Sequence, residues 1–111
     1  MNPLESPDTL RAHLAEQPGV ALYFSAPGCG VCSVLKPRLQ ALFAGRFPQL
    51  EWLEVDSAAR PELAAQAQVF TIPTLVVYLD GREALRRARH FSPAEVEEAL
   101  ERPYGFLFDT P

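Results

Sequence analysis

Two cysteines separated by two residues, Cys29 and Cys32, are the side chains of this sequence whose type and spacing could do chemistry. They are the only 2 cysteines among its 111 residues. An apolar run at 20–24 precedes them and an amphipathic pattern follows, so the pair should lie where a strand passes into a helix. Free N–H groups and the helix dipole at a helix start stabilise an anion such as a thiolate. This arrangement favours thiol–disulfide exchange.

The two sulfurs should differ in role because they should differ in depth. We expect Cys29 at the very N-terminus of the helix, exposed and stabilised as a thiolate, where it attacks a target disulfide. We expect Cys32 one turn further in and more buried, where it resolves the mixed disulfide. The position matters because a thiol with a pKa of about 8.5 is only about 3% thiolate near neutral pH, whereas one with a pKa of about 7 is roughly half thiolate.

Metal binding and inert buried thiols are the alternatives for this pair. A zinc site needs about four ligands. Only His13 and His90 could complete one, and neither has the spacing of a zinc motif. We therefore predict no metal and no bound cofactor.

The composition limits the class of partner and the compartment. The formal net charge of −4 argues against nucleic acid, because phosphate contacts need a basic face. No stretch approaches the ~18 apolar residues of a membrane helix, and no targeting segment is visible at the start. We expect a cytoplasmic location and no membrane partner. In reducing cytoplasm, cysteines this close together are rarely a structural staple.

The rest of the chain predicts the elements that position the pair. In order, they are a helix from Ser6 to Pro18-Gly19, a strand at 20–24, a helix from the cysteines to about 45–46, a strand at 51–56, a short helix at 58–67, strands at 74–79 and 84–91 joined by an Asp80-Gly81 hairpin turn, and a helix from Ser92 to Pro103. This order predicts an α/β fold with a central mixed sheet of four to five strands and helices on both faces. The fifth strand would come from the first six residues. We predict one domain at 1–111, with an aromatic tail at 104–111.

The tail and one helix carry further local predictions. Pro37 lies inside the helix that follows the cysteines, so we expect a kink there. Tyr104, Phe106 and Phe108 alternate along the chain, which suits a strand facing something apolar. That apolar surface could belong to the same domain, to a partner or to a second copy of the chain.

Several segments together resemble the thioredoxin family. They are Tyr23-Phe24-Ser25-Ala26-Pro27-Gly28-Cys29-Gly30-Val31-Cys32 with Pro37 in the next helix, then Val69-Phe70-Thr71-Ile72-Pro73-Thr74-Leu75, then the Asp80-Gly81 hairpin. The resemblance covers roughly 8–100 and implies a thioredoxin-like fold. It also implies that the Ile72–Pro73 bond is cis and faces the disulfide, and that backbone groups of Ile72 pair with an extended target chain.

The departures from the family pattern fall around the same site. Where many relatives have Trp before the first cysteine this chain has Gly28, and between the cysteines it has Gly30 and Val31. Tyr23 stands in place of a buried Asp, Trp52 in place of its lysine partner, and Arg89 in place of a glycine. Tyr23 is interpreted as a core aromatic. Without the acid, we expect slower resolution by Cys32 unless water accepts its proton.

The resemblance also suggests which residues meet the target chain. We predict that these are Gly28, Gly30, Val31, Ile72, Pro73 and Arg89. Arg89 should favour acidic or carboxylate-bearing targets, or stabilise the Cys29 thiolate.

Together, the residues and the resemblance predict a thiol–disulfide oxidoreductase. Its substrates would be protein disulfides, and its electrons would come from a thioredoxin reductase or another thiol donor. The alternative is a non-catalytic partner-binding module that uses the groove at the cis-proline and the C-terminal tail. A glutathione-dependent reading is weaker, because no glutathione-binding signature is present.

Overall fold

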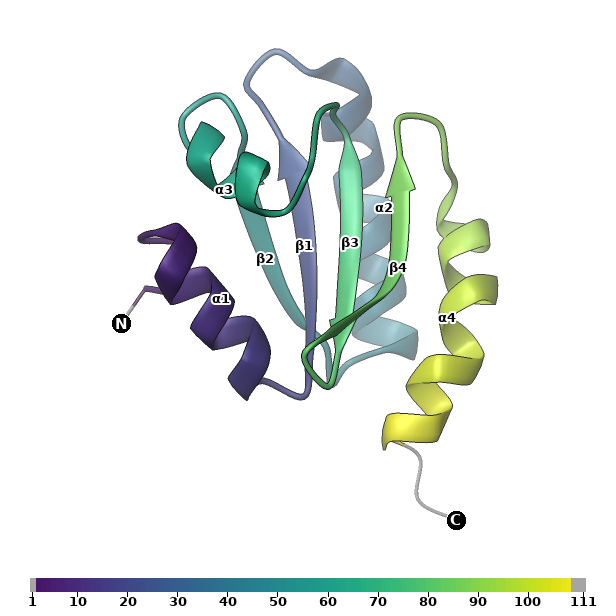
Figure 1. Ribbon diagram of the computed structural model, residues 1–111. Coiled ribbons are helices and arrows are strands. Elements are labelled where there is room, and N and C mark those ends of the chain that lie inside the picture. The colour runs from purple at the N-terminus through teal and green to yellow at the C-terminus, as the bar shows by residue number, and fades with distance from the viewer. Residues whose placement is uncertain (1, 109–111) are drawn as a thin grey trace.

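Four strands form one mixed sheet in the computed structural model, which describes residues 2–108 (Figure 1). The strands are β1 (Gly19–Ser25), β2 (Glu51–Asp56), β3 (Thr74–Leu79) and β4 (Arg82–Ala88), in the order β2-β1-β3-β4. β1 runs parallel to β2 and antiparallel to β3, which in turn is antiparallel to β4. The predicted α/β fold with a central mixed sheet is therefore confirmed, and the sheet has four strands. Turns and bends occupy residues 3–6, so the possible leading strand is absent there.

Helices cover both faces of this sheet, as predicted. They are α1 (Pro7–Glu16), α2 (Gly30–Arg46), α3 (Pro61–Gln66) and α4 (Pro93–Phe108). α1 and α3 lie on one face, and α2 and α4 lie on the other (Figure 1). Across the part of the chain that the structure describes, no helix is long and apolar enough to cross a membrane.

β1 is central, and its side chains serve two cores. Alternate residues of a strand point to opposite faces of the sheet. Ala21 and Tyr23 accordingly pack with α2 and α4, whereas Leu22 and Phe24 pack with α1 and α3. All four are fully buried, which explains the continuous apolar run that the sequence shows at this strand.

The topology brings the cysteines to one end of the sheet. β1 leads into α2 at the end where β3 begins, since Phe24 near the end of β1 pairs with Thr74 at the start of antiparallel β3. The loop that precedes β3 therefore lies beside the start of α2, and β4 ends at the same end of the sheet (Figure 1). These three segments build the candidate site.

The C-terminal region differs from the prediction. α4 does not end at Pro103 but continues through it to Phe108, so the predicted strand in the tail is wrong. Tyr104 is buried, with its ring centroid 5.0 Å from that of Phe47 and 4.6 Å from that of Phe108. This part of the tail packs against its own chain. Residues 109–111 of the predicted tail lie outside the described residues.

Two other boundaries also moved. α3 is shorter than predicted and begins at Pro61, because residues 57–59 form a turn in which the Asp56 carboxylate accepts from the N–H groups of Ala58 and Ala59. β4 begins earlier, at Arg82, and ends at Ala88 rather than continuing to Phe91. Its early end leaves Arg89 and His90 in a loop beside the cysteines.

Candidate active site

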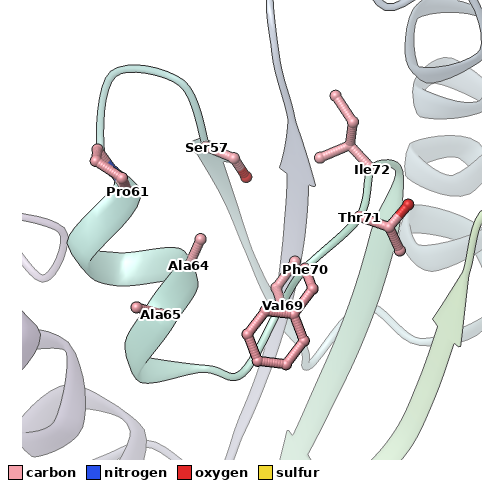
Figure 2. A pocket seen from close by; sticks show the side chains of 8 residues that line it. All are labelled: Ser57, Pro61, Ala64, Ala65, Val69, Phe70, Thr71 and Ile72. Atoms are coloured by element: carbon pink, nitrogen blue, oxygen red, sulfur yellow. The ribbon is translucent and has the colours of Figure 1, made fainter.

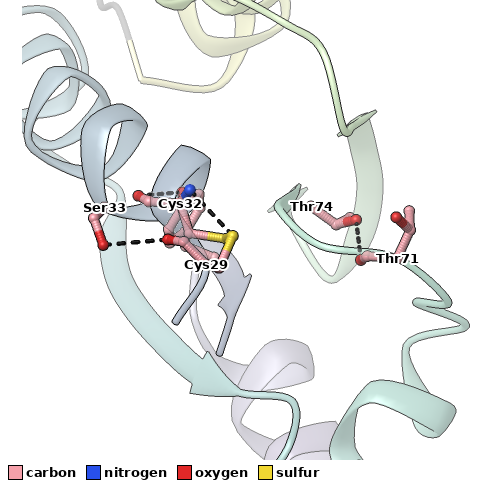
Figure 3. The surroundings of a disulfide bond; sticks show 6 residues. Cys29, Cys32, Ser33, Thr71 and Thr74 are labelled. Atoms are coloured by element: carbon pink, nitrogen blue, oxygen red, sulfur yellow. Dashed lines mark hydrogen bonds between the residues drawn. A yellow bond between two sulfur atoms is a disulfide. The ribbon is translucent and has the colours of Figure 1, made fainter. Parts of the chain in front are cut away.

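Cys29 and Cys32 form a disulfide at the start of α2, with their Cα atoms 5.3 Å apart. Cys29 is the N-cap of the helix, and the Cys32 N–H donates to the Cys29 sulfur at 3.2 Å. Ser33 strengthens the same turn, because its hydroxyl donates to the Cys29 carbonyl at 3.2 Å (Figure 3). A sulfur that already accepts a helix N–H is well placed to carry negative charge.

The two cysteines differ in depth, as the sequence predicts. Cys29 is partly exposed, whereas Cys32 is only 3% exposed and belongs to the core between the sheet, α2 and α4. An attacking thiol must reach its target, and a resolving thiol must reach only its neighbour. The geometry thus allows the division of roles expected for this pair.

The disulfide faces the loop that carries the cis-proline. The Ile72–Pro73 peptide bond is cis, as the resemblance implies. Figure 3 shows Cys29 and Cys32 opposite Thr71 and Thr74, and the Thr74 hydroxyl donates to the Thr71 carbonyl at 2.8 Å. A side-chain bond of this kind holds the loop just before β3 starts.

A groove of about 320 Å³ lies between the disulfide, this loop and the end of β4. Its lining is Cys29, Gly30, Val31, Thr71, Ile72, Pro73, Arg89 and His90. Five of the six residues predicted to meet a target thus line one groove beside Cys29. The sixth, Gly28, lies in the turn before Cys29, exposed and with φ of +83°. Neither Thr71 nor His90 was among the site residues predicted from the sequence.

Arg89 connects two walls of the groove. Its N–H donates to the Pro73 carbonyl at 2.8 Å, and its Nε donates to the Thr71 hydroxyl at 3.2 Å. Its backbone has φ of +66°, a left-handed conformation that glycine adopts without steric cost and that arginine rarely adopts. The family pattern has a glycine at this position, and the backbone of Arg89 has the conformation that a glycine would favour.

Tyr23 lies behind Cys32 and engages its backbone. The buried Tyr23 hydroxyl donates to the Cys32 carbonyl at 2.9 Å. Burial, together with the nearby negative charge of Glu54, raises the pKa of Tyr23 to about 12. A phenol with so high a pKa stays protonated near neutral pH, and its hydroxyl already donates a hydrogen bond. It therefore does not act as a base there. The interpretation of Tyr23 as a core aromatic fits this geometry.

A carboxylate lies next to Tyr23 on the neighbouring strand, and sequence reasoning missed it. Glu54 pairs in register with Tyr23, accepts from the Trp52 indole at 3.1 Å and forms an ion pair with Lys36 at 2.9 Å. Trp52 stacks on Tyr23, with ring centroids 5.4 Å apart. An acid and a lysine are thus present on this face, but both come from positions other than those the family pattern indicates. The strand register places Glu54 beside Tyr23, and the ion pair places Lys36 beside Glu54.

A second hollow, of about 390 Å³, lies between α3 and the loop that leads to the cis-proline (Figure 2). α3 and the loop residues Val69–Ile72 line it, and it shares Thr71 and Ile72 with the groove at the disulfide. Phe70, at the edge of this hollow, is 88% exposed. A large apolar side chain is thus left uncovered beside this hollow.

Within residues 2–108, no group of three or more histidine, cysteine or acidic side chains is placed to hold a metal ion. The two sulfurs are joined to each other and have His90 as their only such neighbour in the groove lining.

An α/β fold with a cysteine pair at the start of a helix, opposite a cis-proline, defines a class of small redox proteins. The thioredoxin family model matches residues 4–102. A thioredoxin-like protein, YdfQ of Bacillus subtilis, is 35% identical over 83 residues, which cover 75% of this chain and 73% of that protein. The thioredoxin of Chlamydia trachomatis is 42% identical over 67 residues, which cover 60% of this chain and 65% of that protein.

Solved structures agree with the sequence comparisons. Thioredoxin 1 of Thermosipho africanus superposes with a TM-score of 0.71 at 30% identity, over 78% of this chain and 96% of that one. The chain therefore belongs to the thioredoxin family, as its motifs indicated. Its close cysteine pair is consistent with a thiol–disulfide oxidoreductase.

Proposed function

We propose that this protein exchanges disulfides with protein substrates, with Cys29 as the attacking thiol and Cys32 as the resolving thiol. The observation that carries the proposal is the contrast within one pair: Cys29 lines an open groove at a helix N-terminus, and Cys32 is 3% exposed directly beneath it. Family membership supports the same chemistry.

The reaction uses the two sulfurs, with water as the donor and acceptor of protons. The Cys29 thiolate attacks one sulfur of the target, so a Cys29–target bond forms and the target disulfide breaks. The departing target sulfur leaves as a thiolate and takes a proton from water. Cys32, having given its proton to water, then attacks the Cys29 sulfur and expels the second target thiolate. Two electrons pass to the target, and the Cys29–Cys32 disulfide seen in the structure is the oxidised product.

The groove supports an extended protein chain as the substrate. Gly30 and Gly28 leave space, since nothing lies within 4 Å of a Cβ built on either residue. Ile72, next to the cis-proline, is half-buried and offers its backbone to a strand-like segment. The reducing equivalents would come from a thioredoxin reductase or another thiol donor in a reducing, cytoplasmic compartment.

Replacing each cysteine separately tests the assignment of roles. With Cys32→Ser, Cys29 still attacks but nothing resolves the intermediate, so a covalent complex with a disulfide-containing peptide should accumulate. With Cys29→Ser, no complex should form, because Cys32 is buried. Non-reducing electrophoresis and mass spectrometry of the complex provide the measurement. Equal trapping by both variants would contradict the assignment.

The midpoint potential of the pair tests the activity itself. The protein would be equilibrated in thiol buffers, and its free cysteines would be counted by alkylation. Thioredoxin-like reductants have midpoint potentials of about −270 mV, and isomerase-like proteins of about −180 mV. A reversible transition in that range is expected, and its position tells reductant from oxidant.

A non-catalytic binding module is the second candidate, and the exposed Phe70 ring favours it. Such a protein would hold partners in the groove at the cis-proline without exchanging electrons. If the cysteine pair never reopens or never closes in thiol buffers, this reading replaces the first.

A further inference from the structure

The groove at the disulfide continues into a larger hollow beside α2. This hollow has a volume of about 770 Å³. Its lining is Gly30, Val31, Val34, Leu35, Arg38, Arg89, His90 and Phe91. Four of these residues also line the groove at Cys29, so one continuous surface runs from the cis-proline loop, past the disulfide, to the outer face of α2. We call this surface the extended groove.

The extended groove carries positive charge on a protein that is negative overall. Arg38 and Arg89 are exposed on its walls, and neither forms an ion pair with a carboxylate of residues 2–108. None of the residues that line it is Asp or Glu, although the whole chain has 14 acidic residues and a net charge of −4. The charge beside the reacting sulfur thus has the opposite sign to that of the molecule.

The floor of the extended groove is apolar. Val31 and Val34 are 55% and 58% exposed on the face of α2 that borders it, and Phe91 lies at the opposite side. The two valines are one helical turn apart, and both expose apolar surface to water. An apolar side chain of a bound segment would cover them. An apolar floor between two arginines suits a peptide better than a highly hydrated polyanion.

We propose that the extended groove binds an acidic segment, with interspersed apolar residues, of the protein whose disulfide is exchanged. This inference rests on the proposed function and names its class of substrate. Carboxylates of the segment pair with Arg38 and Arg89, whose guanidinium groups can bind a carboxylate through two parallel hydrogen bonds. Apolar side chains of the segment cover Val31 and Val34. The target disulfide then lies over Cys29.

Short disulfide peptides that differ only in flanking charge test the proposal. Three peptides of equal length would carry one disulfide flanked by Glu, Gln or Lys together with one Leu. Each rate constant for reduction by the reduced protein would be divided by that for reduction by dithiothreitol. This ratio removes the effect of the flanking charge on the intrinsic reactivity of the disulfide. We expect the Glu peptide to exceed the Lys peptide by about tenfold at low salt.

Salt dependence and variants with altered charge locate the effect. The preference should shrink as salt is raised, because the Debye length falls from about 10 Å at 0.1 M to about 3 Å at 1 M. Arg38→Glu and Arg89→Gln should each reduce the preference at least threefold. Arg82→Glu is the matched control, since Arg82 is exposed at the hairpin end of β4, remote from the disulfide. It should leave the preference unchanged although it alters the net charge as much as Arg38→Glu.

The outcomes separate this inference from the proposed function. Equal normalised rates for all three peptides would overturn the acidic-segment proposal and leave the exchange activity standing. An equal effect of Arg82→Glu and Arg38→Glu would also overturn it, because net charge rather than the groove would then set the preference. Glutathione disulfide would be assayed beside the three peptides. If it reacts faster than the Gln peptide and the Glu peptide does not, the groove selects a small carboxylate-bearing disulfide, and the proposal of an acidic protein segment is wrong. If no peptide is reduced at all, both proposals fail.

Discussion

Tyr23 gives the site a different back wall from the one its family pattern indicates. A phenol that donates to the Cys32 carbonyl and stacks on Trp52 fixes the first turn of α2 against β1. It supplies no negative charge at neutral pH, because its pKa is raised to about 12. Any proton that leaves Cys32 must therefore go to water or to a group other than Tyr23. The residue contributes position rather than proton transfer.

Alkaline titration tests this environment. Because the pKa of Tyr23 is raised in the folded state, its contribution to stability is fully present below pH about 10 and is lost as the pH rises through about 12. Over that range, the free energy of unfolding of the native protein should fall relative to that of Tyr23→Phe by about 2 kcal/mol. Denaturant unfolding of both proteins at several pH values provides the measurement. Parallel profiles would contradict the buried, neutral phenol.

Glu54→Gln offers a finer version of the same test. Burial is the larger cause of the raised pKa and the Glu54 charge is the smaller one. Removing that charge should lower the pKa of Tyr23, but not to its ordinary value. The absorbance of tyrosinate would be followed during titration, with Tyr23→Phe used to identify the signal. A titration unchanged by Glu54→Gln would show that the carboxylate does not act on this phenol.

At the scale of elements, the loop after β4 holds an arginine in a backbone conformation suited to glycine. A residue with a Cβ in the left-handed region costs about 1 kcal/mol or more. The Arg89 side chain offsets part of this cost through its bond to Thr71. The chain after β4 therefore accepts an unfavourable backbone conformation at Arg89, and this residue supplies a cation beside Cys29.

A pair of substitutions separates the two effects. Arg89→Ala removes the Thr71 bond and keeps the Cβ, whereas Arg89→Gly removes both. Arg89→Gly should therefore be more stable than Arg89→Ala by roughly 1 kcal/mol. Chemical denaturation of the two variants under identical conditions measures the difference. Equal stabilities would mean that the backbone at this residue relaxes and is not strained.

Most elements were predictable from local patterns, and the exceptions have a physical reason. β1 and β3 were found because buried central strands are apolar throughout, and α1 because Ser6 caps it and Pro7 suits its first turn. The end of α4 was missed because Tyr104 and Phe108 are four residues apart, a spacing that fits one helical face as well as alternation along a strand. Burial of Tyr104 against Phe47 decides between them and outweighs the break expected at Pro103.

The site was predictable as far as its motifs extend. Cys29, Ile72 and Pro73 belong to recognisable segments, and all three line one groove. Arg38 and Glu54 belong to no motif, and only the packing of α2 and the register of β2 bring them to the site. Local sequence patterns do not encode such long-range neighbours.

At the scale of the whole molecule, the two ends of the sheet do different work. The start of α2, the cis-proline loop and the end of β4 meet at one end, where the cysteine pair lies. At the other end, the last turns of α4 cover the segment that follows α2. The Tyr104 ring packs against Phe47, and its hydroxyl accepts from the Gln49 N–H at 3.2 Å. Stability and exchange should therefore be separable by mutation.

Tyr104→Ala should lower the free energy of unfolding by roughly 3 kcal/mol, because it removes a buried aromatic ring. Phe106→Ala is the control, since that ring is 85% exposed, and it should change stability by only about 0.5 kcal/mol or less. Neither variant should alter the rate of disulfide exchange at temperatures where the protein stays folded. Denaturant unfolding and peptide reduction measure the two properties. A slowed exchange in Tyr104→Ala would show that the two ends are coupled.

The aromatic layer behind the disulfide also makes the molecule optically informative. Trp52 is the only tryptophan and is half-buried. Its ring stacks on Tyr23 and lies edge-to-face with Phe43, with 5.6 Å between the centroids of Trp52 and Phe43. Excitation of that single indole reports on the contact between β1, β2 and α2. When the helix leaves the sheet, the indole enters water and its emission shifts to longer wavelength. Folding of this protein can therefore be followed by its own fluorescence, without a label.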